Sequence, residues 1–90
     1  MNDAQAIVLK ALQEATGQMT EPETLAALER GEDVSFENMV FDSLDRFEAM
    51  MMIEEALDIE LDDDEVMAQR SFLALSAFVA QKAATGAHAG

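Results

Sequence analysis

The segment Met39–Glu65, MVFDSLDRFEAMMMIEEALDIELDDDE, contains the strongest helical pattern of the chain. Apolar residues recur at helical spacing from Leu44 to Leu57, with acidic residues between them. Asp42 or Ser43 can begin this helix, because a side-chain oxygen at the N-cap accepts a hydrogen bond from the first turn. The sequence therefore predicts a helix that starts at one of these residues and ends before the acidic run DIELDDDEV.

The residues of this predicted helix divide into an inner and an outer set. We expect the core to contain Leu44, Phe47, Met50, Met51, Ile53 and Leu57, and solvent to meet Asp45, Glu48 and Glu55. Three consecutive methionines cannot share one face of a helix. Met51 is therefore expected to point inward beside Met50, and Met52 partly outward, where it is available to a partner.

Start and stop signals predict two helices before this segment. Asn2 or Asp3 can cap the first, and Gly17 suits the left-handed residue that ends it. The sequence TEPETLAALERG predicts a short second helix, since Thr20 and Glu23 have the spacing of a capping box.

The remaining segments have weaker patterns. Residues 32–41 lack a period and predict a loop that its apolar side chains pin to the core. A short acidic turn is expected at 63–68. Ser71 can cap a last helix, whose predicted inner residues are Phe72, Leu75, Phe78 and Val79.

Composition favours helices over strands. Half of the residues are hydrophobic, mostly Ala, Leu and Met, whereas Val and Ile are few and Tyr and Trp are absent. Ninety residues fit one domain with a modest core. The predicted fold is all-α, a small bundle of three main helices plus short helical turns. We expect a single domain over residues 1–82 and a flexible C-terminal tail over 83–90.

The charge of the chain is strongly negative. Five Lys and Arg against nineteen Asp and Glu give a net charge of −14 at pH 7. Such a surface repels phosphate backbones and anionic lipid, so we expect no nucleic-acid or membrane partner. It favours partners with basic patches. Without a signal-peptide pattern or an apolar run long enough to cross a bilayer, the chain is expected to be a cytoplasmic monomer.

Residue types that often serve catalysis or metal binding do not combine into a site. An EF-hand loop starting at Asp58 needs Gly at its sixth and Glu at its twelfth position, where this chain has Asp63 and Gln69. His88 is the only histidine, in an Ala- and Gly-rich end where nothing holds it as a base. Cys is absent. We therefore predict a solvated acidic surface, no catalytic or metal-binding residue, and no enzyme activity.

Ser43 has two interpretations. A serine at a helix start is most simply a cap. However, Ser43 follows Asp42, precedes Leu44 and opens the most amphipathic helix of the chain. The N–H groups and partial positive charge at such a helix end suit a phosphate bonded to the hydroxyl. These features make attachment possible without identifying it.

The run FDSLDRFEAMMMIEEALDIELDDDE resembles the acyl carrier proteins, whose modification site is Asp-Ser-Leu at the start of the second helix. Residues matching those typical of the family's fatty-acid members are Asp45, Glu48, Met51, Glu54, Glu55, Asp58 and Glu60. SFLALSAFV resembles the family's final helix, and the likeness covers about residues 34–80.

The resemblance implies that a phosphopantetheinyl transferase attaches 4′-phosphopantetheine covalently to the Ser43 hydroxyl, with Asp42 orienting the site. The thiol of this arm would carry acyl or related groups as thioesters between enzymes. Leu44 and Met51 would belong to the helix face and the pocket lip that shelters short cargo. Asp45, Glu48 and Glu55 would contact basic patches on partner enzymes. These partners are the transferase and the acyl-loading and acyl-transferring enzymes.

The chain departs from the family pattern at the entry to the helix and in the first loop. Val40 and Phe41 precede the motif where a Gly is frequent, Asp62 replaces a common Pro, and TEPETLAALERGED is long for a first loop. These departures favour a specialised lipid or secondary-metabolite pathway. The alternative is an unmodified acidic adaptor that binds basic partner helices through its Met-rich face. Dependence on the Ser43 hydroxyl separates the two.

Overall fold

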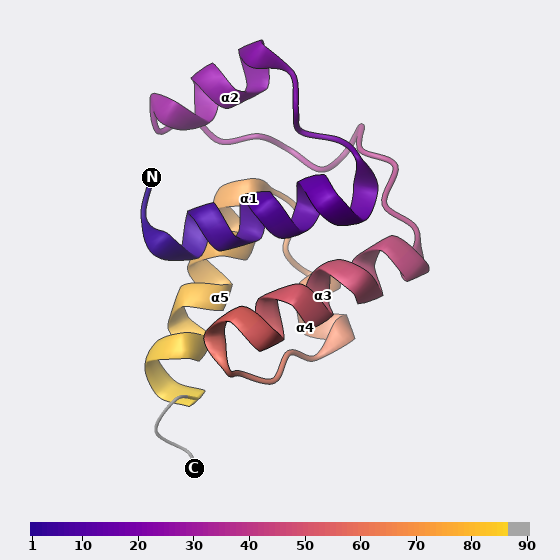
Figure 1. Ribbon diagram of the computed structural model, residues 1–90, viewed down its shortest axis with the longest axis vertical. Coiled ribbons are helices and arrows are strands. Elements are labelled where there is room, and N and C mark those ends of the chain that lie inside the picture. Colours follow the sequence, from indigo (N-terminus) through magenta and orange to yellow (C-terminus); the bar gives the residue numbers. More distant parts are fainter. Residues whose placement is uncertain (87–90) are drawn as a thin grey trace.

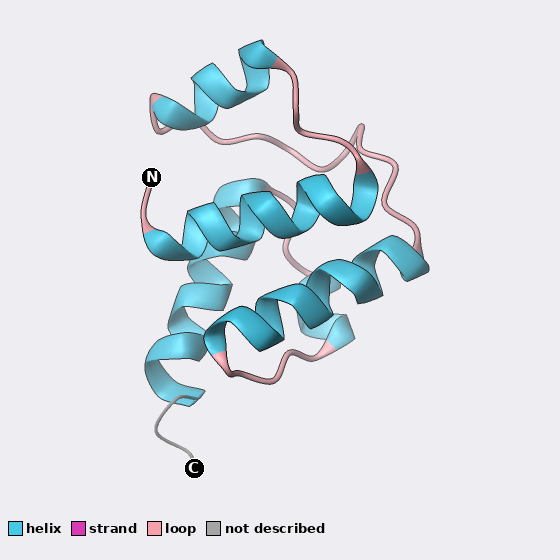
Figure 2. Ribbon diagram, viewed as in Figure 1, coloured by secondary structure: helices cyan, strands magenta, loops and turns pink. Residues whose placement is uncertain are grey.

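The computed structural model describes residues 1–86, which contain five helices and no strand (Figures 1 and 2). In chain order the helices are α1 (Asp3–Thr16), α2 (Pro22–Glu29), α3 (Ser43–Leu57), α4 (Asp63–Met67) and α5 (Phe72–Gly86). The predicted all-α bundle is confirmed. Within these residues no helix is long and apolar enough to cross a membrane.

The core lies around α1, which packs against both α3 and α5 (Figure 1). The side chains with almost no exposed surface come from these three helices and are Val8, Leu12, Ile53, Phe72, Leu75 and Val79. The short helix α2 lies at the edge of the bundle, beyond α1 from α3. The first loop therefore adds a helix without adding much core.

The first helix begins and ends as predicted. Asn2 is its N-cap, and the side chains of Asn2 and Gln5 form a capping box through each other's backbone N–H groups. Gly17 adopts φ 70°, the left-handed conformation that glycine takes without steric cost, and its N–H donates to Gln13.

The predicted capping box of α2 is wrong. Glu21, not Thr20, is the N-cap, and no side chain caps the helix. Pro22 is the reason, because its fixed φ suits the first helical position and its missing N–H is not needed there. The helix therefore starts one residue later than a box between Thr20 and Glu23 requires.

The loop over 32–41 is tied to the start of α5. The Asp33 carboxylate accepts hydrogen bonds from the backbone N–H groups of Val34 and Leu73, both at 2.8 Å. The backbone N–H of Phe72 donates to Val34 at 2.8 Å. Ser71 caps α5 as predicted, since its hydroxyl accepts from the N–H of Ala74. Four apolar loop residues pack partly buried against the core, as expected, namely Val34, Phe36, Met39 and Phe41, whereas Val40 is exposed.

The predicted inner face of α3 is partly wrong. Leu44, Phe47 and Met51 are 65%, 58% and 43% exposed, and the buried residues are Ala49, Met50 and Ile53. At 100° per residue the two sets lie on opposite sides of the helix. The helix is apolar on both sides, and the side containing the small Ala49 takes the core. Met52 is partly buried against the core, so the predicted orientations of Met51 and Met52 are reversed.

The last helix is longer than predicted. α5 continues to Gly86, past the expected boundary at residue 82. His88 lies outside the described residues. The short acidic turn expected at 63–68 is the helix α4.

Candidate functional site

Asp42 and Ser43 have different roles at the start of α3. The Asp42 carboxylate accepts a hydrogen bond from the backbone N–H of Asp45 at 2.9 Å, which makes Asp42 the N-cap. Ser43 is the first helical residue, and its side chain is exposed. Of the two caps that the sequence allows, the structure therefore has Asp42, and Ser43 is not needed for capping.

The hydroxyl of Ser43 stands apart from the other three serine hydroxyls of the chain. Within residues 1–86 it takes part in no side-chain hydrogen bond. Ser35 accepts from the N–H of Glu37, and Ser71 caps α5. Ser76 is buried. In the described part of the chain, Ser43 alone combines an exposed side chain, an unengaged hydroxyl and a helix N-terminus.

The segment that leads into Ser43 is fixed by contacts distant in sequence. The Gln18 amide pairs with Val40 twice, donating to its carbonyl oxygen and accepting from its N–H. The rings of Phe36 and Phe41 lie 6.2 Å apart at a tilt of 47°. Gln18 of the first loop thus holds the backbone of Val40 in place, directly before Phe41 and the start of α3. The pairing by Gln18 was not predicted, because nothing near Gln18 in sequence signals it.

A shallow groove of about 580 Å³ runs beside Ser43. Its walls come from α3 and from the segment that leads into α4, and its lining residues are Ser43, Leu44, Arg46, Phe47, Met50, Leu61 and Asp63. Its lining is mainly apolar, with the Arg46–Asp63 ion pair at one side. An apolar group held near Ser43 can therefore leave water in this groove.

The Arg46–Asp63 ion pair joins α3 to α4. Arg46 Nε lies 2.7 Å from Asp63 Oδ1, with the arginine largely buried and the aspartate about half exposed. Its hydrogen bond lowers the pKa of Asp63 and raises the pKa of Arg46. The pair holds α4 beside the first turn of α3.

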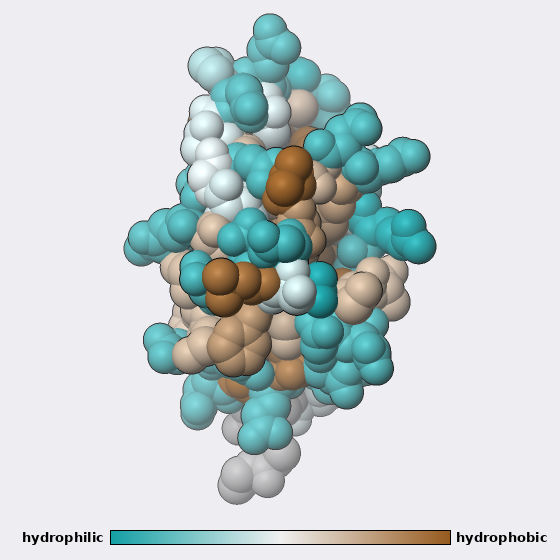
Figure 3. All heavy atoms as spheres, turned by 90° about the vertical axis from the view of Figure 1, so that its right-hand side faces the viewer, coloured by the Kyte–Doolittle hydropathy of each residue, from teal (hydrophilic) through white to brown (hydrophobic). Residues whose placement is uncertain are grey.

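The predicted partner residues do not all lie on one surface. Glu48 and Glu55 are exposed, whereas Asp45 is half-buried. Met52 is half-buried against α1, where it lines a shallow hollow with Ile7. The exposed apolar residues beside the two glutamates are instead Leu44, Phe47 and Met51. Figure 3 shows apolar side chains among hydrophilic ones on the face at which α3 begins. The helical spacing of residues 44, 47 and 51 could have indicated this exposed apolar surface, but we interpreted it as part of the core.

The chain matches the family model described as phosphopantetheine attachment site, over residues 6–79. It belongs to this family. Carrier domains of this family hold 4′-phosphopantetheine covalently and are not enzymes, so the chain is a phosphopantetheine carrier. Its partners include a phosphopantetheinyl transferase and acyl-handling enzymes. Neither a curated protein nor a solved structure matches this carrier domain.

Proposed function

We propose that the carrier holds 4′-phosphopantetheine on Ser43 Oγ and transports acyl or related groups as thioesters in a specialised lipid or secondary-metabolite pathway. The observation that carries the proposal is the exposed, unengaged hydroxyl of Ser43 at the N-terminus of α3. The first-turn N–H groups and the helix dipole stabilise a phosphate there. The residues around Ser43 therefore fit a serine-linked phosphodiester.

Attachment requires one bond to form and one to break. Ser43 Oγ forms a P–O bond to the phosphate of the pantetheine arm while the pyrophosphate bond of coenzyme A breaks. Adenosine 3′,5′-bisphosphate leaves, and the hydroxyl proton passes to the transferase or solvent. Asp42 fixes the first turn of α3 through Asp45 and so orients Ser43 toward the modifying enzyme. The arm, once bound, supplies a thiol that this Cys-free chain lacks.

The partner surface that we propose is the outer side of α3. Leu44, Phe47 and Met51 form an apolar stripe that starts beside Ser43, and Glu48 and Glu55 border it. This arrangement suits partners that present an apolar hollow surrounded by Arg and Lys. Exposed ion pairs contribute about 0–1 kcal/mol each, which suits brief contacts with several enzymes. Asp45 and Met52 lie at the margin of this surface.

The same stripe supports the alternative function. An unmodified acidic adaptor would bind a basic amphipathic helix through the stripe and its glutamates. The adaptor needs no hydroxyl at Ser43, so its binding would survive Ser43→Ala.

Loading with an acylated arm tests the carrier function. The purified protein is incubated with acetyl-coenzyme A and a broad-specificity phosphopantetheinyl transferase, and its intact mass is measured before and after neutral hydroxylamine. A carrier gains the acetylated arm and then loses only the acetyl group, because hydroxylamine cleaves thioesters. A protein that gains no mass with several transferases is not a carrier, and the adaptor would then be favoured.

A further inference from the structure

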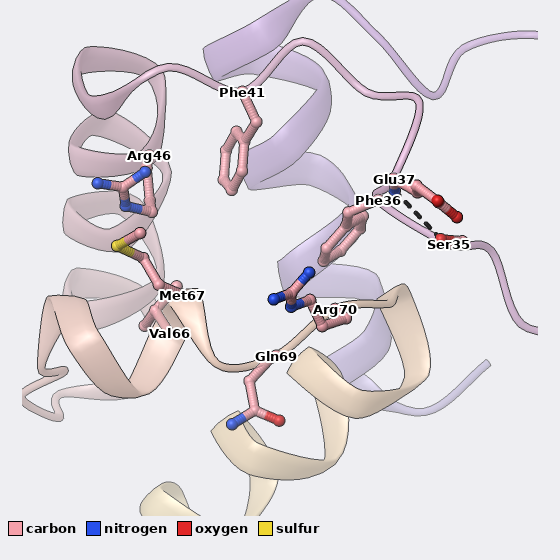
Figure 4. A pocket seen from close by; sticks show the side chains of 9 residues that line it. All are labelled: Ser35, Phe36, Glu37, Phe41, Arg46, Val66, Met67, Gln69 and Arg70. Atoms are coloured by element: carbon pink, nitrogen blue, oxygen red, sulfur yellow. Dashed lines mark hydrogen bonds between the residues drawn. The ribbon is translucent and has the colours of Figure 1, made fainter.

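A further pocket, of about 620 Å³, is lined in part by Phe36 and Phe41 of the loop that precedes α3 (Figure 4). The loop before α3, α3 itself, α4 and the short connection between α4 and α5 all contribute to it, and its lining residues are Ser35, Phe36, Glu37, Phe41, Arg46, Val66, Met67, Gln69 and Arg70. Two aromatic rings, a valine and a methionine give it an apolar part. Its other lining residues are polar or charged, which is unusual for a pocket that would hold only a hydrocarbon chain.

The charge in this pocket comes from Arg70. Three of the five cationic side chains have a carboxylate partner within 4.0 Å among residues 1–86, in the pairs Arg30–Glu32, Arg46–Asp63 and Lys82–Glu65. Arg70 forms no ion pair in this part of the chain, although nineteen acidic residues are present. Of the cations that line the pocket, Arg46 is bound to Asp63 and Arg70 is free.

The geometry directs Arg70 toward the pocket. In Figure 4 its guanidinium points toward the ring of Phe36, while the Glu37 carboxylate points away from the other lining residues. The backbone around Arg70 is fixed, because its carbonyl oxygen accepts from the N–H of Phe36 at 2.9 Å. Arg70 is exposed at the edge of the pocket, and its guanidinium, unpaired among residues 1–86, offers two parallel donors to a carboxylate there.

The pocket lies close to Ser43. Arg46 lines both this pocket and the groove that contains Ser43, and it follows Ser43 by three residues on the same helix. Residues three apart are neighbours on a helix surface. A group carried on an arm from Ser43 can therefore enter the pocket past Arg46.

We propose that this pocket selects cargo with a terminal carboxylate, such as an acyl group derived from a dicarboxylic acid. The proposal rests on the proposed attachment at Ser43 and specifies the class of cargo. The chain of such a cargo would lie between Phe36, Phe41 and Met67, and its carboxylate would pair with Arg70. A plain alkyl chain of equal length would remove water from the guanidinium without replacing its hydrogen bonds, which is unfavourable.

Matched cargoes test the proposal. The wild type is loaded on Ser43 with hexanoyl or adipoyl phosphopantetheine, six-carbon groups that differ in the terminal carboxylate. The rate of thioester cleavage by neutral hydroxylamine is measured for each and divided by the rate for the same free acyl-pantetheine. We expect the adipoyl protein to be protected severalfold more than the hexanoyl protein. Arg70→Gln should remove this difference in protection. The control variant Arg30→Gln should keep the difference, because Arg30 is an exposed arginine at the end of α2.

The side-chain NMR signal of Arg70 identifies the anion. A shift of its Nε–H signal in the adipoyl form, absent from the hexanoyl form, supports the proposal. The same shift in the protein that carries the arm without an acyl group would assign the anion to the phosphodiester and overturn it. Equal protection of both cargoes after verified loading would overturn the proposal that the pocket selects a terminal carboxylate. The proposed attachment at Ser43 would be unaffected by that result. Failure to load Ser43 would overturn both proposals.

Discussion

The Asp42 carboxylate accepts the backbone N–H of Asp45 at 2.9 Å and thereby caps α3. This bond leaves the neighbouring Ser43 hydroxyl with no structural task among the described residues. The two adjacent residues can therefore be varied separately: we expect a change at Asp42 to affect helix stability and a change at Ser43 to affect the proposed attachment.

Substitution of the two residues should change stability unequally. Asp42→Ala should lower the free energy of unfolding by about 1 kcal/mol, because the cap is lost. Ser43→Ala should change it by less than about 0.5 kcal/mol, since an exposed residue without a partner is removed. Urea denaturation followed by circular dichroism measures both. An equal loss in the two variants would show that Ser43 shares the capping role.

The Arg46–Asp63 pair should contribute to stability in a pH-dependent way. Arg46 lowers the pKa of Asp63 in the folded state, so the contribution is present above the ordinary aspartate pKa of about 4. It is lost as the pH falls through the lower, folded-state pKa. The difference in unfolding free energy between wild type and Arg46→Gln should therefore be largest near neutral pH and shrink in acid. Parallel stability curves down to strongly acidic pH would contradict the coupling.

Charge reversal on the outer side of α3 should slow modification. Glu48→Lys should reduce the transferase's kcat/KM severalfold at low salt and flatten its dependence on salt, because the reversed charge opposes electrostatic steering. Glu29→Lys is the matched control, since Glu29 is exposed on α2, away from α3. Equal rates for Glu48→Lys and wild type at low salt would exclude this surface from docking.

Added salt should stabilise the fold. The net charge of −14 destabilises the compact state through self-repulsion, and ions screen that repulsion within about 10 Å at 0.1 M. The melting temperature, followed by circular dichroism, should rise as sodium chloride is raised from low concentration to about the physiological range. A melting temperature that stays constant or falls would contradict this expectation.

Local signals predicted the elements better than the contacts between them. The starts of α1, α3 and α5 were predicted to within one residue from short side chains that cap helices through nearby backbone groups. The structure selects Asn2 and Asp42 from the two candidates at each of the first two helices and confirms Ser71 at the third. The outer stripe of α3 was misassigned, because apolar residues lie on both sides of the helix and only packing against α1 selects one.

Long-range contacts at the site had no local signal. The pairing of Gln18 with Val40 joins residues far apart in sequence. Arg70 and Phe36 line one pocket because the loop over 32–41 is hydrogen-bonded to the segment before α5. The Asp-Ser-Leu motif points to Ser43 as the proposed attachment residue through family resemblance, whereas the pocket is visible only in the folded chain.

The most direct test of the central claim locates the phosphopantetheine on the chain. Wild type, Ser43→Ala and Ser35→Ala are each incubated with coenzyme A and a broad-specificity transferase, and their intact masses are measured. Trypsin releases residues 31–46, which contain both serines, and fragment ions between the two assign the modified one. We expect one added phosphopantetheine on Ser43 in the wild type and in Ser35→Ala, and none in Ser43→Ala. Modification of Ser43→Ala, or a mass gain located on Ser35, would contradict it.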